Sequence, residues 1–348
     1  MSDKPIGKVV DQLAELTGYK DRDVMDVTLV VALRDMLSPL SVSIYRAVGP
    51  LGEQRWLSRA HLGYGEQVPT ADSLAAELSS LAPLDQYPSR AACLQKRELR
   101  ESASRSEFTC HFPLVSEHDG DGVLEVVTRT RLSPAEQRTV SGMLRVYHNF
   151  QSLLDYSERD TLTGLLNRKT FDDSFLKLLQ GMPLASVATV GDRRHDSQPN
   201  YWIGVVDVDH FKRVNDNFGH LIGDEVLLLL SRLMRTCFRF HDRLYRFGGE
   251  EFVALIRCDG EDDAHQAFER LRQACEQYQF PQVGGVTLSI GFTRIRAQDS
   301  PAAAFERADK AVYHAKHHGR NQVHSHERLV EQGHLSDERA SSGDVDLF

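Results

Sequence analysis

The sequence predicts an α+β protein with two folded parts that are joined by a long helix. Three observations lead to this prediction. The chain has 348 residues, which suits two domains at about 150 residues each. Its N-terminal part contains short runs of alternating apolar residues, which are typical of half-buried strands. Its second half alternates strand-like apolar runs with helical patterns, and a long helical pattern separates the two parts.

The composition excludes several classes of protein. Hydrophobic residues make up 41% and charged residues 26%, as in ordinary globular proteins, and the net charge of −9 argues against an extended nucleic-acid-binding surface. The densest apolar runs, Val27–Leu33 and Val226–Leu230, are far shorter than the roughly 18 residues of a membrane span. No signal sequence opens the chain, and the five cysteines form no CxxC pair, so we expect a cytoplasmic protein with reduced thiols.

Residues 1–132 are predicted to form an α+β domain. Apolar residues at helical spacing predict helices over residues 6–38, 73–81 and 91–99. Alternation and β-rich composition predict strands over residues 41–44, 108–114 and 123–128.

Residues 133–159 are predicted to form one long helix. Ser133, Pro134 and Glu136 make a capping-box start. Apolar residues then follow at alternating spacings of three and four, the spacing of a coiled-coil seam: Val140, Met143, Tyr147, Phe150 and Leu154. The alternative is that this apolar stripe packs on the helix's own domain, because the pattern lasts barely two heptads.

Residues 160–327 are predicted to form the second domain, and the polar residues 328–348 a disordered tail. Helices are expected over residues 168–180, 224–238, 264–278 and 301–317. Strands are expected over residues 201–208, 243–247, 250–256, 286–292 and 322–324, with a polar loop over residues 186–200. Gly248 and Gly249 are predicted to form the two-residue turn of a hairpin.

Acidic pairs lie at the ends of two strands that we expect to be buried. Asp207 and Asp209 end the first strand, and Glu250 and Glu251 follow the hairpin turn. Carboxylates that meet on neighbouring strands form an all-oxygen site that suits Mg²⁺, which needs only one or two carboxylates besides substrate phosphates. The alternative for either pair alone is that its carboxylates cap a strand end beside a helix N-terminus.

Polar and basic residues accompany these acids. Asn215 and Asp224 have the donors and acceptors to read a guanine edge, although Asp224 could instead cap a helix. Lys212, Lys316 and Arg320 could bind phosphates, and the alternative for the last two is a solvated basic helix end.

Residues 160–324 resemble the GGDEF domain of diguanylate cyclases. The motifs that carry the resemblance are Asp160–Arg168 (DTLTGLLNR), Asp207–His220 (DVDHFKRVNDNFGH) with Gly223-Asp224, Arg246–Phe252 (RFGGEEF), Ala308–Lys316 (ADKAVYHAK) and Gly319–Asn321 (GRN). Their presence in this order makes the match specific, whereas a lone GGEEF would be weak.

The resemblance implies a palm-like, ferredoxin-like fold and the condensation of two GTP into cyclic di-GMP with loss of two pyrophosphates. It implies that Mg²⁺, or Mn²⁺ in its place, is held by Asp207, Glu250 and the carbonyl of Val208. It implies that Glu250 or Glu251 assists deprotonation of the 3′-hydroxyl, and the sequence does not choose between them. The implied substrate-binding residues are Asn215, Asp224 and His220 for guanine, and Lys212, Lys316 and Arg320 for phosphates.

The resemblance also implies a homodimer, since the family splits its active site between two protomers, and this favours the coiled-coil role for residues 133–159. Arg239, Asp242 and, on the following helix, Arg270 match the family's inhibitory site for the product cyclic di-GMP. The first 132 residues resemble a GAF sensor domain in their order of elements, and the sequence does not predict the sensor's ligand.

Two other functions compete with cyclase activity. One is a non-catalytic receptor that binds GTP or cyclic di-GMP and signals through partners. The other is a dimeric adaptor that uses only the sensor and the helix. The presence of every implied acid, amide and cation favours the active enzyme.

Overall fold

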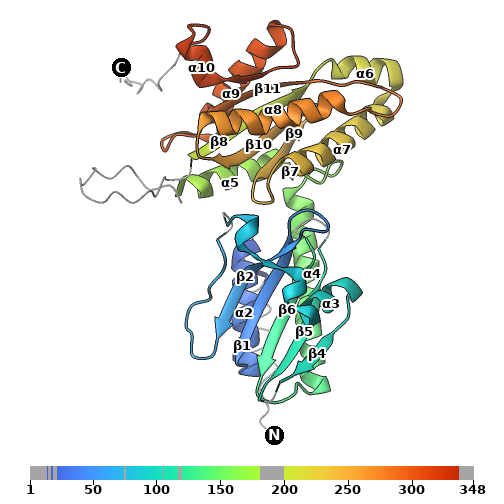
Figure 1. The fold of residues 1–348 in the computed structure, drawn as a ribbon, viewed down its shortest axis with the longest axis vertical. Coiled ribbons are helices and arrows are strands. Elements are labelled where there is room, and N and C mark those ends of the chain that lie inside the picture. The colour runs from blue at the N-terminus through green and yellow to red at the C-terminus, as the bar shows by residue number, and fades with distance from the viewer. Residues whose placement is uncertain are drawn as a thin grey trace, which may run out of the picture. The chain divides into compact units, whose positions relative to one another are not determined.

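The chain forms two compact units in a computed structural model, residues 1–157 and residues 158–348. The structure describes residues 14, 17, 18, 22–73, 76–104, 106–116, 120–180 and 200–336. Figure 1 shows a sheet with helices packed on it in each unit. The loop predicted over residues 186–200 lies almost wholly outside the described residues, as does the start of the first predicted helix.

The first unit contains a six-stranded antiparallel sheet in the order β3-β2-β1-β6-β5-β4. Its strands are β1 (Ser41–Val48), β2 (Arg55–Gly63), β3 (Ala82–Pro83), β4 (Arg100–Ala103), β5 (Phe108–Leu114) and β6 (Gly122–Thr128). Its helices are α2 (Arg22–Leu37), α3 (Pro88–Lys96) and α4 (Pro134–Glu158), with 3₁₀ turns at Leu78–Ser80 and Leu84–Gln86. The predicted helix over residues 73–81 is therefore reduced, in its described part, to one 3₁₀ turn.

Helices α2 and α4 cover one face of this sheet and share its larger apolar core. The capping box at the start of α4 is confirmed, because Glu136 accepts from the backbone N–H of Ser133 at 2.8 Å and donates its own N–H to the Ser133 hydroxyl at 3.3 Å. The predicted coiled-coil seam is wrong. Its residues are buried in, or packed against, the unit's own core, so this stripe is not available to a second chain: Val140, Met143, Tyr147, Phe150 and Leu154.

A buried polar network fixes α4 on the sheet. The Tyr147 hydroxyl donates to Asp26 on α2, and it accepts from Arg46 on β1 at 3.1 Å and from Gln151 at 2.7 Å. Arg59 on β2 adds a bond to Asp26 at 3.3 Å. Polar groups inside an apolar core are costly unless they are paired, so this network favours one position of α4 along the sheet.

The second unit contains a six-stranded mixed sheet in the order β12-β11-β8-β10-β9-β7. Its strands are β7 (Leu166–Asn167), β8 (Asn200–Val208), β9 (Arg243–Gly248), β10 (Glu251–Cys258), β11 (Leu288–Arg294) and β12 (Val323–Ser325). Its helices are α5 (Arg168–Gln180), α6 (Phe211–Phe218), α7 (His220–Cys237), α8 (Glu261–Gln277), α9 (Pro301–His317) and α10 (His326–Glu331).

Helices cover both faces of this second sheet. Side chains of α6, α7 and α8 pack on one face and those of α5 and α9 on the other. The central strand β8 is buried on both sides, which explains its nearly continuous apolar sequence. No described helix is long and apolar enough to cross a bilayer.

Three further expectations are corrected. Strand β2 was not predicted, because its arginines and histidine interrupt the apolar alternation. Helix α6 was not predicted, because its short apolar face carries only Phe211 and Val214 into the core. Residues 328–336 are not a disordered tail, because α10 buries Leu329 and Arg328 pairs with Glu261 at 2.9 Å.

Tyr147→Phe is expected to lower the free energy of unfolding of the first unit by about 1–3 kcal/mol, because it leaves the buried Asp26 carboxylate without its hydroxyl donor. Chemical denaturation of the full chain measures this change. Tyr64→Phe, at an exposed tyrosine of the same unit just after β2, is the matched control and should have no effect. Equal stability of the two variants would contradict the role given to the Tyr147 hydroxyl.

Candidate active site

The register of three antiparallel strands gathers the acids. β8 lies between β10 and β11, and Asp207 on β8 is directly opposite Glu251 on β10 and Ser289 on β11. Glu250 lies beside the same strand end, where its carbonyl accepts from the N–H of Val208 at 3.4 Å. Asp207, Glu250 and Glu251 are thus brought together, as the sequence predicted.

The hairpin turn lies one residue later than predicted. β9 ends at Gly248 and β10 begins at Glu251, so Gly249 and Glu250 occupy the turn. A register shift between Glu251 and Phe252 accommodates the extra residue. Glu250 therefore lies in the turn and Glu251 in the strand, which frees the Glu250 side chain from the alternation of the strand.

Arg246 holds this turn in place. Its guanidinium donates to the carbonyl of Gly249 at 2.9 and 3.2 Å and to Asp160 at 3.0 Å. Asp160 is itself fixed by the backbone N–H and the hydroxyl of Thr163, and these bonds and Arg246 lower its pKa although burial opposes the change. Sequence analysis gave Asp160 and Arg246 no role, and their place in the motifs was the available signal.

Lys316 faces the acids from the last turn of α9. Its ammonium lies 2.7 Å from a carboxylate oxygen of Asp207. Burial raises the pKa of Asp207, Lys316 opposes this rise, and Glu251 adds to it. Burial and the charge of Asp207 likewise raise the pKa of Glu250. The cluster therefore carries more negative charge than Lys316 neutralises.

This excess of charge fits a divalent cation. Asp207 and Glu250 offer hard oxygen ligands, and Mg²⁺ uses one or two carboxylates together with substrate phosphates and water. In the described part of the chain, no three His, Cys, Asp or Glu side chains already surround one point. The carbonyl of Val208 as a ligand remains a prediction.

Close packing of α9 on β11 sets the position of Lys316. A β-carbon at Gly291 would lie 2.2 Å from the carbonyl oxygen of Ala308 and 2.4 Å from the backbone nitrogen of Val312. Only glycine therefore lets α9 approach the sheet this closely. After α9, the turn Gly319–Asn321 carries Arg320, whose side chain has no hydrogen bond or ion pair with any described residue.

Asp209 has a different role from Asp207. Its carboxylate accepts from Thr287 and Ser289, each at 2.7 Å, and from the backbone N–H of Asn321 at 3.0 Å. The two acids that the sequence placed at one strand end thus have different surroundings. Asp207 belongs to the acidic cluster, and Asp209 belongs to a structural hydrogen-bond network.

The predicted guanine-binding residues lie on α6 and α7. A β-carbon at Gly223 would lie 2.0 Å from the side-chain oxygen of Asn215, so Asn215 lies directly over Gly223, the residue before Asp224. Asp224, His220 and Lys212 are exposed and make no side-chain hydrogen bond or ion pair with described residues. Their roles in binding remain predictions.

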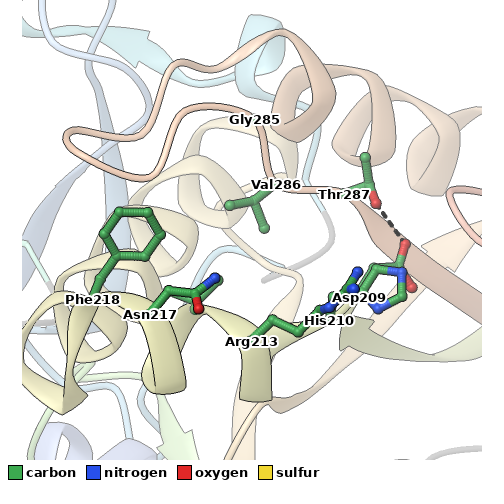
Figure 2. A pocket seen from close by; sticks show the side chains of 9 residues that line it. Asp209, His210, Arg213, Asn217, Phe218, Gly285, Val286 and Thr287 are labelled. Atoms are coloured by element: carbon green, nitrogen blue, oxygen red, sulfur yellow. Dashed lines mark hydrogen bonds between the residues drawn. The ribbon is translucent and has the colours of Figure 1, made fainter.

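A small cavity of about 170 Å³ lies on another side of α6. Figure 2 shows its lining, which includes Arg213, Asn217 and Phe218 of α6 and the segment Gly285–Thr287. Lys212 and Asn215 do not line it, so it is separate from the predicted guanine-binding residues.

The predicted inhibitory residues gather at one turn. Arg270 on α8 donates to the carbonyl of Cys237 at 2.6 and 3.0 Å, just before Arg239. The Asp242 carboxylate accepts from the backbone N–H of Arg239 at 2.8 Å, and burial raises its pKa. Its side chain is only 5% exposed, so Asp242 closes this turn and can meet a ligand only if the turn opens.

Glu250→Gln is expected to raise the melting temperature of the second unit in metal-free buffer. The pKa of Glu250 is raised in the folded protein, so its ionised form opposes folding, and stability falls as pH rises through that pKa. The gain should therefore be largest at neutral and alkaline pH and should vanish at acid pH. Calorimetry checks this, with Glu331→Gln on the exposed face of α10 as control; a lower melting temperature for Glu250→Gln at neutral pH would contradict it.

The second unit is similar to known proteins. The family described as "Diguanylate cyclase, GGDEF domain" matches residues 157–322. Diguanylate cyclase DgcP of Pseudomonas aeruginosa is 39% identical over 167 residues, covering 47% of this chain and 23% of that protein. Diguanylate cyclase DgcZ of Escherichia coli is 32% identical over 168 residues, covering 47% of this chain and 52% of that protein.

The response regulator PleD of Caulobacter vibrioides is 30% identical over 284 residues, covering 73% of this chain and 59% of that protein. The chain thus spans about half or less of the length of the first two relatives. The crystal structure of the GGDEF domain of DgcB from Caulobacter crescentus in complex with c-di-GMP aligns with a TM-score of 0.42 and 28% identity, covering 49% of this chain and 96% of that one. Residues 157–322 of this chain thus match the GGDEF domain family.

Proposed function

We propose that this protein is a diguanylate cyclase, which condenses two GTP into cyclic di-GMP and two pyrophosphates. The observation that carries the proposal is the cluster of Asp207, Glu250 and Glu251 with Lys316 at the end of β8. The names of the relatives support it, since DgcP and DgcZ are diguanylate cyclases. A receptor without activity would not need acids whose mutual repulsion opposes folding.

The residues of the cluster divide the work of phosphoryl transfer. Asp207 and Glu250, with the carbonyl of Val208, would hold Mg²⁺ or Mn²⁺, which supplies charge neutralisation at the phosphates when it is bound. Glu250 or Glu251 would take the proton of the attacking 3′-hydroxyl. Lys316, which contacts Asp207, would donate to a phosphate oxygen of the bound GTP.

Other residues would bind the substrate. The Arg320 guanidinium and the Lys212 ammonium would bind the outer phosphates. Asn215 and Asp224, with His220 nearby, would read the guanine edge from α6 and α7.

Activity would require two copies of the chain, because each copy presents one GTP and the 3′-hydroxyl of one must meet the α-phosphate of the other. We propose that they associate as a homodimer through a second stripe of α4, whose residues again follow at spacings of four and three. The stripe is half-buried at Gly142 and Val146 and exposed at Asn149, Leu153 and Tyr156. Leu153 is 64% and Tyr156 80% exposed, so both side chains are accessible to a second chain.

The first unit would be a GAF-like sensor that controls the cyclase. Its antiparallel sheet with two helices on one face supports this, and so does α4, which begins in its core and ends at the start of the GGDEF domain. On the other face, the buried Arg90 lies 3.5 Å from the ring centre of Tyr45 and pairs with Glu125 at 2.9 Å. We propose no ligand for this sensor.

We propose a cytoplasmic location, which fits an enzyme that consumes GTP.

Incubation of the purified protein with GTP and Mg²⁺, followed by nucleotide chromatography, tests this function. Cyclic di-GMP and pyrophosphate should form in a ratio of one to two, and Glu250→Gln should abolish both, because an amide is a poor Mg²⁺ ligand. Specific activity should fall on dilution as dimers dissociate. GTP binding by the wild type without any product would favour the receptor instead.

Product feedback is a second part of the proposal. Arg239 and Arg270 lie at the turn that Asp242 closes, and two guanidinium groups suit the phosphates of cyclic di-GMP. Asp242 would exchange its backbone donors for a guanine edge only after the turn opens. Product bound here would link domains and keep the two GTP sites apart.

Arg239→Ala should keep progress curves linear to higher product levels while the initial rate changes little, because Arg239 lies outside the acidic cluster. Initial rates with added cyclic di-GMP, measured for the variant and the wild type, check this. Arg243→Ala, an exposed residue at the start of β9, is the control. Equal inhibition of Arg239→Ala and the wild type would refute the inhibitory site.

A further inference from the structure

The turn that carries Arg320 has an unusual backbone. Arg320 and Asn321 both have positive φ angles, 60° and 50°, directly after Gly319 at 113°. Asparagine tolerates the left-handed region, but arginine rarely adopts it, so two such residues in a row are strained. Strain of this kind persists only where surrounding contacts impose it, and it is frequent at ligand-binding sites.

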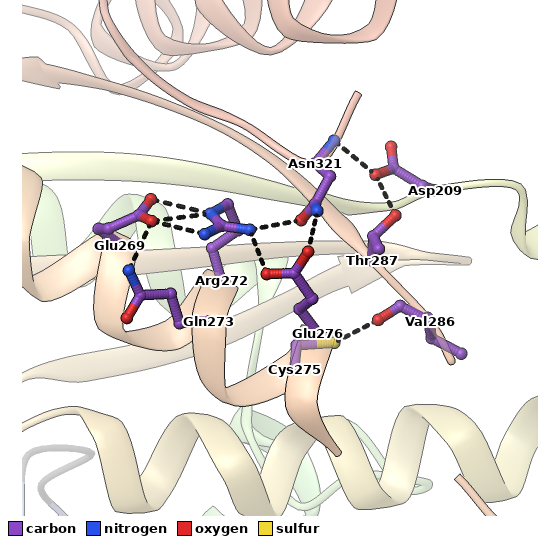
Figure 3. Close-up of polar contacts among 9 residues, drawn as sticks. All are labelled: Asp209, Glu269, Arg272, Gln273, Cys275, Glu276, Val286, Thr287 and Asn321. Atoms are coloured by element: carbon purple, nitrogen blue, oxygen red, sulfur yellow. Dashed lines mark hydrogen bonds and ion pairs between the residues drawn. The ribbon is translucent and has the colours of Figure 1, made fainter. Parts of the chain in front are cut away.

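Asn321 is bound on three sides (Figure 3). Its backbone N–H donates to Asp209 at 3.0 Å, its side-chain oxygen accepts from Arg272 at 2.8 Å, and its side-chain amide donates to Glu276 at 2.7 Å. Both partners of the side chain lie on α8, and Asp209 directly follows β8. Hydrogen bonds therefore connect the turn both to α8 and to the end of β8, where the acidic cluster lies.

Arg272 is itself rigidly held. Its guanidinium donates to Glu269 at 2.6–3.0 Å and to Glu276 at 2.9 Å, and its side chain is only 13% exposed. These two carboxylates raise its pKa, so it is charged at every physiological pH. A planar guanidinium fixed by two carboxylates presents its remaining donor in one direction, toward Asn321.

The Arg320 side chain is not needed for any of these contacts. It has no hydrogen bond or ion pair with described residues, although its backbone N–H closes the end of α9 on Ala315 at 2.9 Å. Lys316, four residues earlier, contacts Asp207. A strained turn with a hydrogen-bonded asparagine thus carries a cation that has no partner among the described residues, four residues after the lysine that contacts the acidic cluster.

We infer that Arg272, acting through Asn321, is a positioning residue that holds Arg320 where it can bind the phosphates of GTP. The inference rests on the proposed function for its substrate. Arg272 itself does not touch GTP. Its effect on GTP binding passes through the backbone of the turn and requires Arg320.

A double-mutant cycle tests this inference. Two variants remove the link in different ways: Arg272→Met removes the donor, and Asn321→Gly removes the side chain while still allowing a positive φ. Each should raise KM for GTP by about tenfold, the effect of misplacing one charge-assisted contact, with little change in kcat. In an Arg320→Ala background, neither should raise KM further, because the group that they position is already absent.

Gln273→Ala is the matched control, since Gln273 lies on the same helix and bonds Glu269 but not Asn321. It should leave KM unchanged. Calorimetric Kd values for α,β-methylene GTP with Mg²⁺ give a readout that does not need turnover. A wild type that binds this analogue but makes no cyclic di-GMP would defeat the proposed function. The positioning role would still be supported if Arg272→Met and Asn321→Gly raised Kd only when the Arg320 side chain is present.

The inference would be overturned if Arg272→Met and Asn321→Gly raised KM and Kd equally with and without the Arg320 side chain. The two substitutions would then affect GTP binding without acting through Arg320. Unchanged KM and Kd in both Arg272→Met and Asn321→Gly would overturn it as well.

Discussion

The antiparallel register of β8 between β10 and β11 is the constraint on which the candidate site depends. It places Asp207 opposite Glu251 and beside the Glu250 turn, and it leads Asp209 out of the strand toward Thr287 and Asn321. A slip of one residue would turn Asp207 toward the opposite face of the sheet, away from Lys316. Burial of β8 by helices on both faces fixes the register, since a slip would carry its polar end into an apolar core.

Gathering these acids costs stability, and the neighbouring residues offset part of the cost. Burial raises the pKa values of Asp207 and Glu250, so both carboxylates oppose folding in their ionised forms. Lys316 neutralises one of them, and Arg246 fixes the turn that carries the other. A divalent cation, bound together with a triphosphate, would compensate the remaining negative charge. The carboxylates that lower stability are therefore the ones proposed to act in function.

The sequence was most informative where chemistry-bearing residues stand at fixed spacings. The motifs pointed to Asp207, Glu250, Glu251 and Lys316, which the structure brings together. Local patterns failed where tertiary packing decides: the seam of α4 is buried by its own sheet, and the Gly-Gly turn moves to Gly249 and Glu250 because a bulge absorbs one residue. Asn321 and Arg272 were missed because their contact joins residues 49 positions apart, which no spacing rule relates.

The central claim is that Asp207 and Glu250 form a binding site for a divalent cation. Titration of the protein with Mn²⁺ in the presence of α,β-methylene GTP, followed by electron paramagnetic resonance of the free ion, tests it most directly. The wild type should bind Mn²⁺ stoichiometrically, and Asp207→Asn should lose most of this affinity, while Asp216→Asn on the exposed side of α6 should keep it. Equal Mn²⁺ affinity in the wild type and Asp207→Asn would contradict the account.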